Sequence, residues 1–216
     1  MKLSACIFDL DGVIVDTAKY HYLAWKRLAD EMGFFFSEDH NERLKGVSRM
    51  DSLEILLSVG NIKKTAEEKE YLANRKNTWY VEYICDLSPN EILPGALELL
   101  GFLKSKDILI ALGSASKNAR AILKGIKLES AFDSIVDGNR IAKAKPDPQV
   151  FTTAADDLKV QYEECIVFED AEAGVEAALR AGMKCIGIGS PLNLGKAHLV
   201  VPSLDKLNFD ALFHMK

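Results

Sequence analysis

The feature that most constrains the fold is an apolar run near the start of the chain that ends in two carboxylates. Ala5–Phe8 has the length and composition of a strand that is buried on both faces. Asp9 and Asp11 follow it two positions apart, so in extended geometry their side chains project to the same side. Gly12 then allows a tight turn beside a ligand. Because open parallel sheets bind ligands at the carboxyl ends of their strands, the pattern predicts a site there.

Two acids held this close favour a bound cation or a shared proton, because like charges disfavour each other's ionisation. A magnesium ion would satisfy one carboxylate and leave the other available for proton transfer. The alternative is an ordinary surface turn, since acidic residues beside a glycine are common in turns. The remainder of the chain favours the functional interpretation.

Size, charge and cysteine content restrict the classes of function. A chain of 216 residues can build one core domain with a smaller insert. Its net charge of −5 provides no basic surface for nucleic acid. No apolar run reaches the length of a membrane span, and the N-terminus lacks the layout of a secretory signal. The four cysteines lie far apart, and three of them, Cys6, Cys165 and Cys185, lie in apolar strand-like runs, which favours buried thiols over metal ligands or disulfides at those three positions. We therefore expect a cytoplasmic protein, monomeric, without a nucleic-acid or membrane partner.

The periodicity of the chain predicts two domains. Thr17 is the expected N-cap of a helix that ends at Gly33, and residues 65–86 predict another helix. From residue 88 onward strand and helix patterns alternate, as in parallel α/β folds, and residues 200–216 predict a closing strand and helix. We thus expect a Rossmann-like parallel-sheet core with an all-helical cap inserted after its first strand. The expected bounds are residues 1–16 and 88–216 for the catalytic core and 17–87 for the cap.

One helix start within the cap has the character of an anion site. Ser48 and Asp51 have the spacing of a capping box, so a helix should begin at about Arg49. Its free amides would point at the loop Gly46–Ser48, and such helix ends bind anions. Lys45 and Arg49 would strengthen the site. A solvated cap with two incidental basic residues is the alternative, and the residues alone leave both open.

A second group of anion ligands follows the next strand pattern. Ile108–Leu112 reads as a strand that runs into Ser114 and the small residues after it. A helix should follow with Ser116 as its cap, and hydroxyls and amides at such a junction form an anion pocket to which Lys117 adds charge. An ordinary strand-to-helix junction is the alternative.

Two further core segments carry charged residues. Lys145 precedes a proline, which keeps it in extended geometry and lets it reach inward as a fixed positive charge. Composition alone favours the alternative, a solvated lysine. Cys165–Phe168 reads as a strand that ends in Glu169 and Asp170, whose oxygens are suited to magnesium.

These strand ends together carry the parts that phosphoryl transfer needs: a nucleophile, a metal, fixed positive charge and oriented donors. Asp9 is the expected nucleophile, because a carboxylate forms a labile acyl phosphate that can pass the phosphoryl group on. Asp11 is the expected general acid and base. The other expected roles are metal binding by Asp9 with Asp170 and Glu169, and phosphoryl binding by Ser114 and Lys145.

The motifs resemble a known superfamily across nearly the whole chain. They are Asp9-x-Asp11-Gly12, Ser114, Lys145-Pro146 and Glu169-Asp170, in this order. This order resembles the haloacid dehalogenase superfamily of phosphotransferases, and the helical insert is similar to its alpha-helical cap subclass. Four stretches further resemble the sugar-phosphate mutases of that superfamily: residues 16–25, 44–53, 75–77 and 114–118. Residues 137–140 fit the pattern less well.

The resemblance implies a magnesium-dependent interconversion of β-D-glucose 1-phosphate and D-glucose 6-phosphate through an aspartyl phosphate and β-glucose 1,6-bisphosphate. It implies that the backbone carbonyl of Asp11 also contacts the metal, and that His21 and Lys76 couple substrate binding to cap closure. Trp25 would line the pocket or belong to the core of the cap. The implied substrate and phosphate residues are Ser114, Ala115, Ser116, Lys117, Asn118, Lys145, His21, Trp25, Lys45, Gly46, Val47, Ser48, Arg49, Ser52 and Lys76.

Two other functions compete with the mutase. A mutase must hold a bisphosphate by either phosphate in turn, so it needs a second anion site, and closure of the cap would keep water from the acyl phosphate. A magnesium-dependent phosphatase of the same superfamily would share every core residue, but the cap loop at residues 45–49 with His21 favours the mutase. A non-catalytic phosphoryl receiver or metal-binding module would have no use for the cap.

Overall fold

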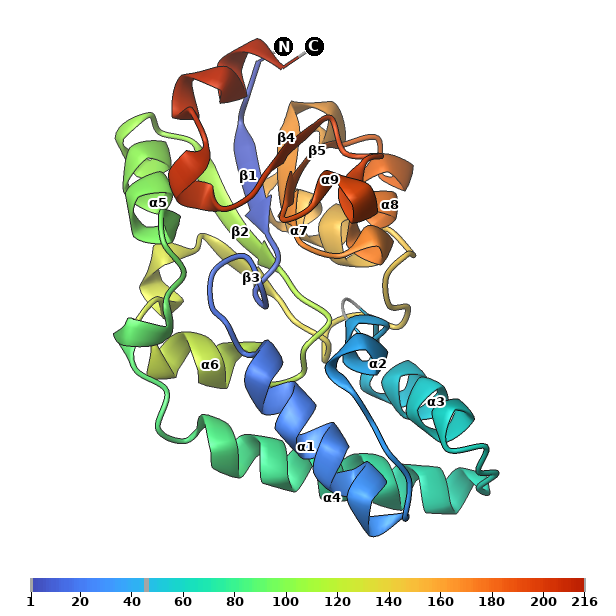
Figure 1. Cartoon of the computed structure of the whole chain (residues 1–216). Coiled ribbons are helices and arrows are strands. Elements are labelled where there is room, and N and C mark those ends of the chain that lie inside the picture. The colour runs from blue at the N-terminus through green and yellow to red at the C-terminus, as the bar shows by residue number, and fades with distance from the viewer. Residues whose placement is uncertain (1, 45–46, 216) are drawn as a thin grey trace.

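The computed structural model describes residues 2–44 and 47–215, and a parallel sheet of six strands in the order β3-β2-β1-β4-β5-β6 forms its centre (Figure 1). The strands are β1 (Ala5–Phe8), β2 (Leu109–Gly113), β3 (Ser134–Val136), β4 (Cys165–Glu169), β5 (Lys184–Ile188) and β6 (Leu199–Val201). The first strand is central, and Phe8 stands level with Leu112 of β2 and Phe168 of β4. The carboxyl ends of these three strands therefore meet at one edge.

Strand β1 is fully buried because hydrophobic layers cover both faces of the sheet. The α-helices that cover it are α5 (Ala96–Ser105), α6 (Ala119–Gly125), α7 (Gln149–Leu158), α8 (Glu172–Arg180) and α9 (Pro191–Leu194). Ile7 packs in the layer that includes α7 and α8, and Phe8 packs in the layer that includes α5 and α6. The Phe8 ring stacks on Phe168 at a centroid distance of 4.5 Å. The alternation along β1 fixes its register.

The end of the chain differs from the sequence-based expectation of a strand and an α-helix. The strand is β6, but a turn of 3-10 helix and then a longer one, Leu204–Lys206 and Phe209–His214, follow it. Phe209 and Leu212 are three residues apart, the spacing that a 3-10 helix places on one side. Leu212 is fully buried and Phe209 packs against Phe102 of α5, so tertiary packing sets the tighter turn. The other 3-10 turns are Pro89–Glu91, Glu129–Ala131 and Tyr162–Glu164.

The inserted cap is helical, as predicted, and in the described part of residues 17–87 it contains no strand. Its helices are α1 (Ala18–Glu31), α2 (Glu38–Glu42), α3 (Arg49–Val59) and α4 (Ala66–Ile84). Figure 1 shows them gathered beyond the carboxyl ends of the strands. Trp25, Leu53 and Tyr80 belong to the core of this layer and are almost fully buried. Among the described residues, no helix is both long and apolar enough to cross a bilayer.

The chain enters and leaves the cap through two segments that run side by side. Val15 forms an antiparallel bridge with Ile92, and the Leu93 amide donates to the Ile14 carbonyl at 2.9 Å. Lys19 at the start of α1 pairs with Glu91 at 2.6 Å. Because the two segments are hydrogen bonded to each other, a change in their dihedral angles moves the four helices together.

Two of the three predicted capping serines and threonines behave differently from the prediction. Ser48 does cap α3, since its side chain accepts from the Asp51 amide at 3.2 Å. Thr17 precedes α1, but its hydroxyl caps no amide and donates to the Asp11 carboxylate instead. Helix α6 begins at Ala119 rather than next to Ser116, because the Ser116 hydroxyl accepts from the Asn118 amide and closes a turn before the helix. In both cases the hydroxyl serves the predicted site.

Candidate active site

A cluster of carboxylates lies where β1 and β4 end. Asp9 follows β1 directly, Glu169 is the last residue of β4, and Asp170 comes next. One carboxylate oxygen from each of the three lies within 4.8 Å of the others. Asp9 is 6% exposed and Glu169 is fully buried. The structure thus brings Asp9 and the Glu169-Asp170 pair together at the carboxyl edge of the sheet.

Lys145 supplies a buried positive charge to this cluster. Its ammonium contacts the Asp9 carboxylate and lies 3.3 Å from Glu169 Oε1, and the residue is 2% exposed. Burial lowers the pKa of Lys145, but the carboxylates of Asp9 and Glu169 outweigh burial and raise it above its usual value. The lysine therefore stays protonated at neutral pH and is held directly against the expected nucleophile.

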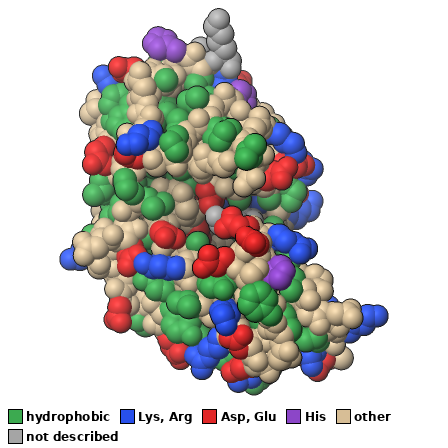
Figure 2. All heavy atoms as spheres, viewed as in Figure 1, with side chains coloured by type: hydrophobic (Ala, Val, Ile, Leu, Met, Phe, Trp, Pro, Cys, Tyr) green, Lys and Arg blue, Asp and Glu red, His purple; other side chains and the backbone are tan. Residues whose placement is uncertain are grey.

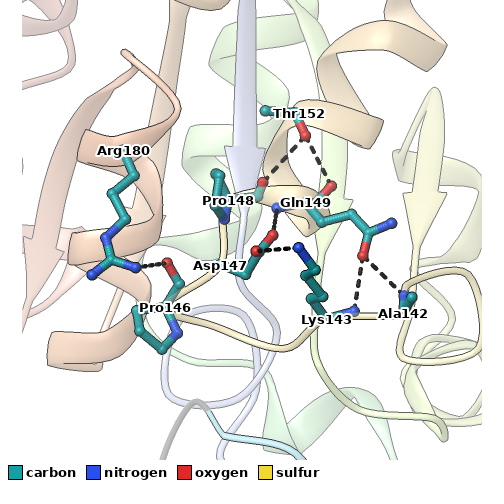
Figure 3. A network of polar contacts seen from close by, with 8 residues as sticks. All are labelled: Ala142, Lys143, Pro146, Asp147, Pro148, Gln149, Thr152 and Arg180. Atoms are coloured by element: carbon teal, nitrogen blue, oxygen red, sulfur yellow. Dashed lines mark hydrogen bonds and ion pairs between the residues drawn. The ribbon is translucent and has the colours of Figure 1, made fainter.

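Lys145 reaches the cluster from a loop, as the proline after it predicts, and lies well beyond the nearest preceding strand end. Strand β3 ends at Val136, well before Lys145. Figure 3 shows the contacts that brace the loop on either side of the lysine. Gln149 accepts from the amides of Ala142 and Lys143 at 2.9 Å each, and Arg180 donates to the Pro146 carbonyl at 3.4 Å. Helices α7 and α8 thus position the loop that carries the charge.

Asp11 lies in surroundings that disfavour its ionisation. Burial raises the pKa of Asp11 well above its usual range, and repulsion from Asp9 and Asp170 raises it further. The Thr17 hydroxyl donates to one of its oxygens. A carboxyl group that keeps its proton near neutral pH can act as a general acid, and after donating it can act as a base. The two neighbouring acids thus have different partners, because Lys145 contacts Asp9 and the Thr17 hydroxyl donates to Asp11.

The oxygen donors of the cluster suit a divalent cation. Three carboxylates with converging oxygens form the hard ligand set that such cations prefer. Burial raises the pKa of Glu169 well above its usual range, and repulsion from Asp9 adds to this while Lys145 opposes it. A cation would compensate that excess of negative charge. Gly12, with φ at +77°, allows Asp170 to approach, because a Cβ there would lie 2.2 Å from Asp170 Oδ2.

The loop after β2 carries the predicted hydroxyl ligands. Ser114 is 1% exposed, and its hydroxyl accepts from the Ser116 amide at 3.1 Å. The Ser116 hydroxyl accepts in turn from the Asn118 amide at 3.2 Å. Because each hydroxyl is fixed as an acceptor, its own proton is available for a bound anion. This loop, at residues 114–118, is called the serine loop below.

A contact that sequence reasoning missed supports the serine loop. The Gly138 amide donates to the Ser116 carbonyl at 3.1 Å, and the Asn139 side chain donates to the Lys117 carbonyl at 3.0 Å. A Cβ on Gly138 would lie 2.3 Å from the Ala115 carbonyl oxygen, so only glycine fits this approach. Residues 137–140 therefore brace the serine loop. Gly138 is the one sequence signal of this contact, because so close a backbone approach requires a glycine.

A cavity of about 580 Å³ separates the cluster from the cap. Its walls include these predicted site residues: Asp9, Asp11, His21, Trp25, Val47, Ser48, Arg49, Ser52, Lys76, Ser114, Ala115, Ser116, Lys117, Asn118 and Asp170. Behind this wall, Lys145 contacts Asp9 and pairs with Glu169 at 3.3 Å. Lys45 and Gly46 lie outside the described residues. Figure 2 shows the boundary between cap and core, where acidic side chains gather on this face.

The cap contributes two cations to the cavity that have no carboxylate partner among the described residues. Arg49 opens α3 and is partly buried. Lys76 of α4 is 2% exposed, with its ammonium 4.5 Å from the Trp25 ring centroid and 2.8 Å from His21 Nδ1. Burial lowers the pKa of both Lys76 and His21 well below their usual values. Trp25 is at once part of the cap core and part of the cavity wall.

This combination of a parallel sheet, an inserted helical cap and an acidic cluster with a lysine defines a class of phosphoryl-transfer enzyme. Residues 3–182 match the family model of haloacid dehalogenase-like hydrolases, and the chain belongs to that family. Family membership and the oxygen cluster together indicate a divalent cation at this site.

Comparison with individual proteins narrows the assignment within this family. The chain is 46% identical over 212 residues to beta-phosphoglucomutase of Bacillus subtilis, covering 97% of this chain and 94% of the relative. It is 37% identical over 201 residues to a phosphorylated carbohydrates phosphatase of Thermotoga maritima, covering 91% and 90%. The crystal structure of beta-phosphoglucomutase from Clostridium difficile superposes with a TM-score of 0.94 at 44% identity and covers 99% of this chain and 96% of that one.

Proposed function

We propose that the chain interconverts β-D-glucose 1-phosphate and D-glucose 6-phosphate, the reaction of a beta-phosphoglucomutase. The observation that carries the proposal is one cavity whose wall includes both the phosphoryl-transfer cluster of the core and two basic residues of the cap, Arg49 and Lys76. A bisphosphate intermediate has a phosphate at each end of the sugar, and such a cavity can hold both. The two beta-phosphoglucomutases that are 46% and 44% identical to this chain support the same reaction.

Asp9 is the proposed nucleophile. Its carboxylate attacks phosphorus, the bond from phosphorus to the sugar oxygen breaks, and an aspartyl phosphate forms. Asp11 gives its proton to the departing sugar oxygen. In the second half-reaction Asp11 removes the proton from the other sugar hydroxyl as that oxygen attacks the phosphoryl group on Asp9. The raised pKa of Asp11 suits it to both steps.

The phosphoryl group needs donors while it is transferred. We propose that Lys145 neutralises its charge and that Ser114 and Ala115 donate hydrogen bonds to its equatorial oxygens. The proposed magnesium ligands are Asp9, Glu169, Asp170 and the backbone carbonyl of Asp11. When bound, the ion would act as a Lewis acid that stabilises charge on the transferring group.

The second phosphate is proposed to bind between cap and core. Ser48, Arg49 and the preceding loop with Lys45 would hold it from the cap, and Ser116, Lys117 and Asn118 would hold it from the core. His21 and Lys76 would couple the binding of this phosphate to closure of the cap. Val47, Ser52 and Trp25 would line the space for the sugar ring. Closure would exclude water from the aspartyl phosphate, which is what distinguishes a mutase from a hydrolase.

We assign residues 1–16 and 88–216 to the catalytic core and 17–87 to the cap, and the paired crossing segments support these bounds. The proposed site draws on one chain, so we propose a monomer, which sedimentation would test. The substrates are charged sugar phosphates, which do not leave cells by diffusion, and we therefore propose a cytoplasmic protein.

The proposal is tested by phosphorus NMR of the protein with magnesium, β-D-glucose 1-phosphate and a trace of the 1,6-bisphosphate. We expect a growing glucose 6-phosphate signal without inorganic phosphate. Inorganic phosphate as the only product would instead favour a sugar-phosphate phosphatase, the function of the relative that is 37% identical. Uptake of a single phosphoryl group without turnover would favour a phosphoryl receiver.

A further inference from the structure

A side-chain hydrogen bond joins the cap helix α4 to the serine loop of the core at the cavity itself. Asn118 of the serine loop donates from Nδ2 to Oδ1 of Asn77 at 2.9 Å. Asn77 lies in α4 and Asn118 precedes α6, and both partly buried residues line the cavity. In the described parts of the chain, the other side-chain hydrogen bonds from α1–α4 to the core are those from Lys19 and Tyr20 to Glu91, beside the crossing segments. The contact therefore lies away from the hinge, where closure brings cap and core together.

Asn118 is held from two directions. Its backbone amide donates to the Ser116 hydroxyl at 3.2 Å, which ties it to the serine loop. Its side-chain amide is oriented by the Asn77 carbonyl, which ties it to the cap. A primary amide has two N–H donors, so one goes to Asn77 and the second can face a phosphate oxygen. Without Asn77, the side chain of Asn118 would rotate among several rotamers, and its second donor would no longer be fixed.

We propose that Asn77 is a positioning residue for the second phosphate, acting through Asn118. The proposal rests on the mutase function above. Asn77 immediately follows Lys76 in α4, so the cap cation and the acceptor for Asn118 move as one unit. The hydrogen bond can form only when cap and core approach, and it orients a phosphate ligand as it forms. Phosphate binding and cap closure therefore stabilise each other, as two events linked to one equilibrium do.

The test is a double-mutant cycle in the full chain with magnesium. Asn77→Ala, Asn118→Ala and the double variant are assayed for conversion of β-D-glucose 1-phosphate primed with the 1,6-bisphosphate. We expect Asn77→Ala to raise KM for the bisphosphate about 5- to 10-fold, the value of one intramolecular hydrogen bond. Adding Asn77→Ala to Asn118→Ala should change KM less than twofold, because Asn77 acts through Asn118.

Two controls separate positioning from a loss of structure. Asn193→Ala changes the same residue type in α9, at an exposed side chain outside the described cavity wall that makes no hydrogen bond among the described residues, and should behave as wild type. Hydrolysis of acetyl phosphate, which carries no second phosphate, should stay within twofold of wild type in Asn77→Ala. Thermal unfolding midpoints would identify any variant that fails to fold, and Asn77→Ser would then replace Asn77→Ala.

Three results would overturn the proposal. These are an unchanged KM in Asn77→Ala, fully additive effects in the double variant, or an equal loss in acetyl phosphate hydrolysis. Failure of the mutase function is a separate outcome, since wild type would then release inorganic phosphate from the sugar phosphate. In that event the same cycle on KM for the hydrolysed sugar phosphate decides whether Asn77 positions Asn118.

Discussion

Gly174 in α8 leaves the space that the Glu169 carboxylate occupies. A Cβ at this position would lie 1.7 Å from Glu169 Oε1 and 2.1 Å from its Cδ. Ordinary contacts begin at 3.4 Å, so in Gly174→Ala the carboxylate or the helix must move by about 1.7 Å. Glu169 is fully buried and also bound by Lys145 at 3.3 Å, so it cannot turn outward into solvent. The displacement therefore reaches the cation site.

Two free-energy terms of opposite sign act on the stability of Gly174→Ala. Alanine in a helix interior is favoured over glycine by about 1 kcal/mol. Forcing a methyl group into a filled core costs about 1–3 kcal/mol. We expect a net loss of about 0–2 kcal/mol in the free energy of unfolding, and a magnesium activation constant that rises about 10- to 100-fold, the usual cost of disturbing a metal site.

Gly101→Ala is the matched control for this change. Gly101 lies within α5, and a Cβ there would meet no atom within 4 Å. This variant should gain about 0.5–1 kcal/mol in stability and leave the magnesium dependence unchanged. Urea unfolding gives the first quantity, and a magnesium titration of the initial rate gives the second. If Gly174→Ala matched Gly101→Ala in both measurements, the argument that Glu169 is sterically held as a metal ligand would fail.

Three further substitutions test separate roles. Asp9→Asn should abolish phosphoryl transfer, because an amide cannot attack phosphorus; normal turnover in the NMR assay would remove the nucleophile assignment. Arg49→Ala should slow sugar-phosphate interconversion about 10- to 100-fold more than acetyl phosphate hydrolysis, and equal losses would exclude Arg49 as a ligand of the second phosphate. Lys76→Met should raise the unfolding midpoint, because it removes a buried ammonium whose pKa is well below its usual 10.5. The Lys76 amine binds its proton more tightly in the unfolded chain than in the folded one. The free energy of unfolding of the wild type, measured relative to Lys76→Met, should therefore increase as pH rises toward 10.5. A difference that does not change with pH would contradict the burial of this charge.

The parts of the site that follow from local pattern could be predicted from the sequence. Asp9 and the Glu169-Asp170 pair come directly after apolar strand patterns, and a parallel sheet necessarily brings such ends together. The cap on α3 followed in the same way, because Ser48 and Asp51 are three residues apart. These signals come from residues that are close together in the sequence, and the strands and the helix cap that they predict are present in the folded structure.

The parts that depend on the three-dimensional path of the chain, and not on a helix or strand period, could not be predicted in this way. Thr17 has the position of an N-cap, but the nearby Asp11 carboxyl takes its hydroxyl. Gly138 and Gly174 read as ordinary glycines until the serine loop and Glu169 are placed beside them. Asn77 is one polar residue among many in α4, and only its contact with Asn118 distinguishes it. Asn77 and Gly138 contact segments far along the chain, whereas Thr17 and Gly174 contact residues only a few positions away through a backbone path that no helix or strand period encodes.

The distribution of charge in the cavity explains how each end binds a phosphate. In the core, the Lys145 ammonium is already neutralised by Asp9 and Glu169, so this end requires a cation before it attracts a phosphate. In the cap, Arg49 and Lys76 have no carboxylate partner among the described residues, and burial lowers the pKa of each. A phosphate beside them would favour their charged forms. A monophosphate can satisfy only one end at a time, whereas a bisphosphate satisfies both, so the closed cavity should favour the doubly phosphorylated sugar over either monophosphate.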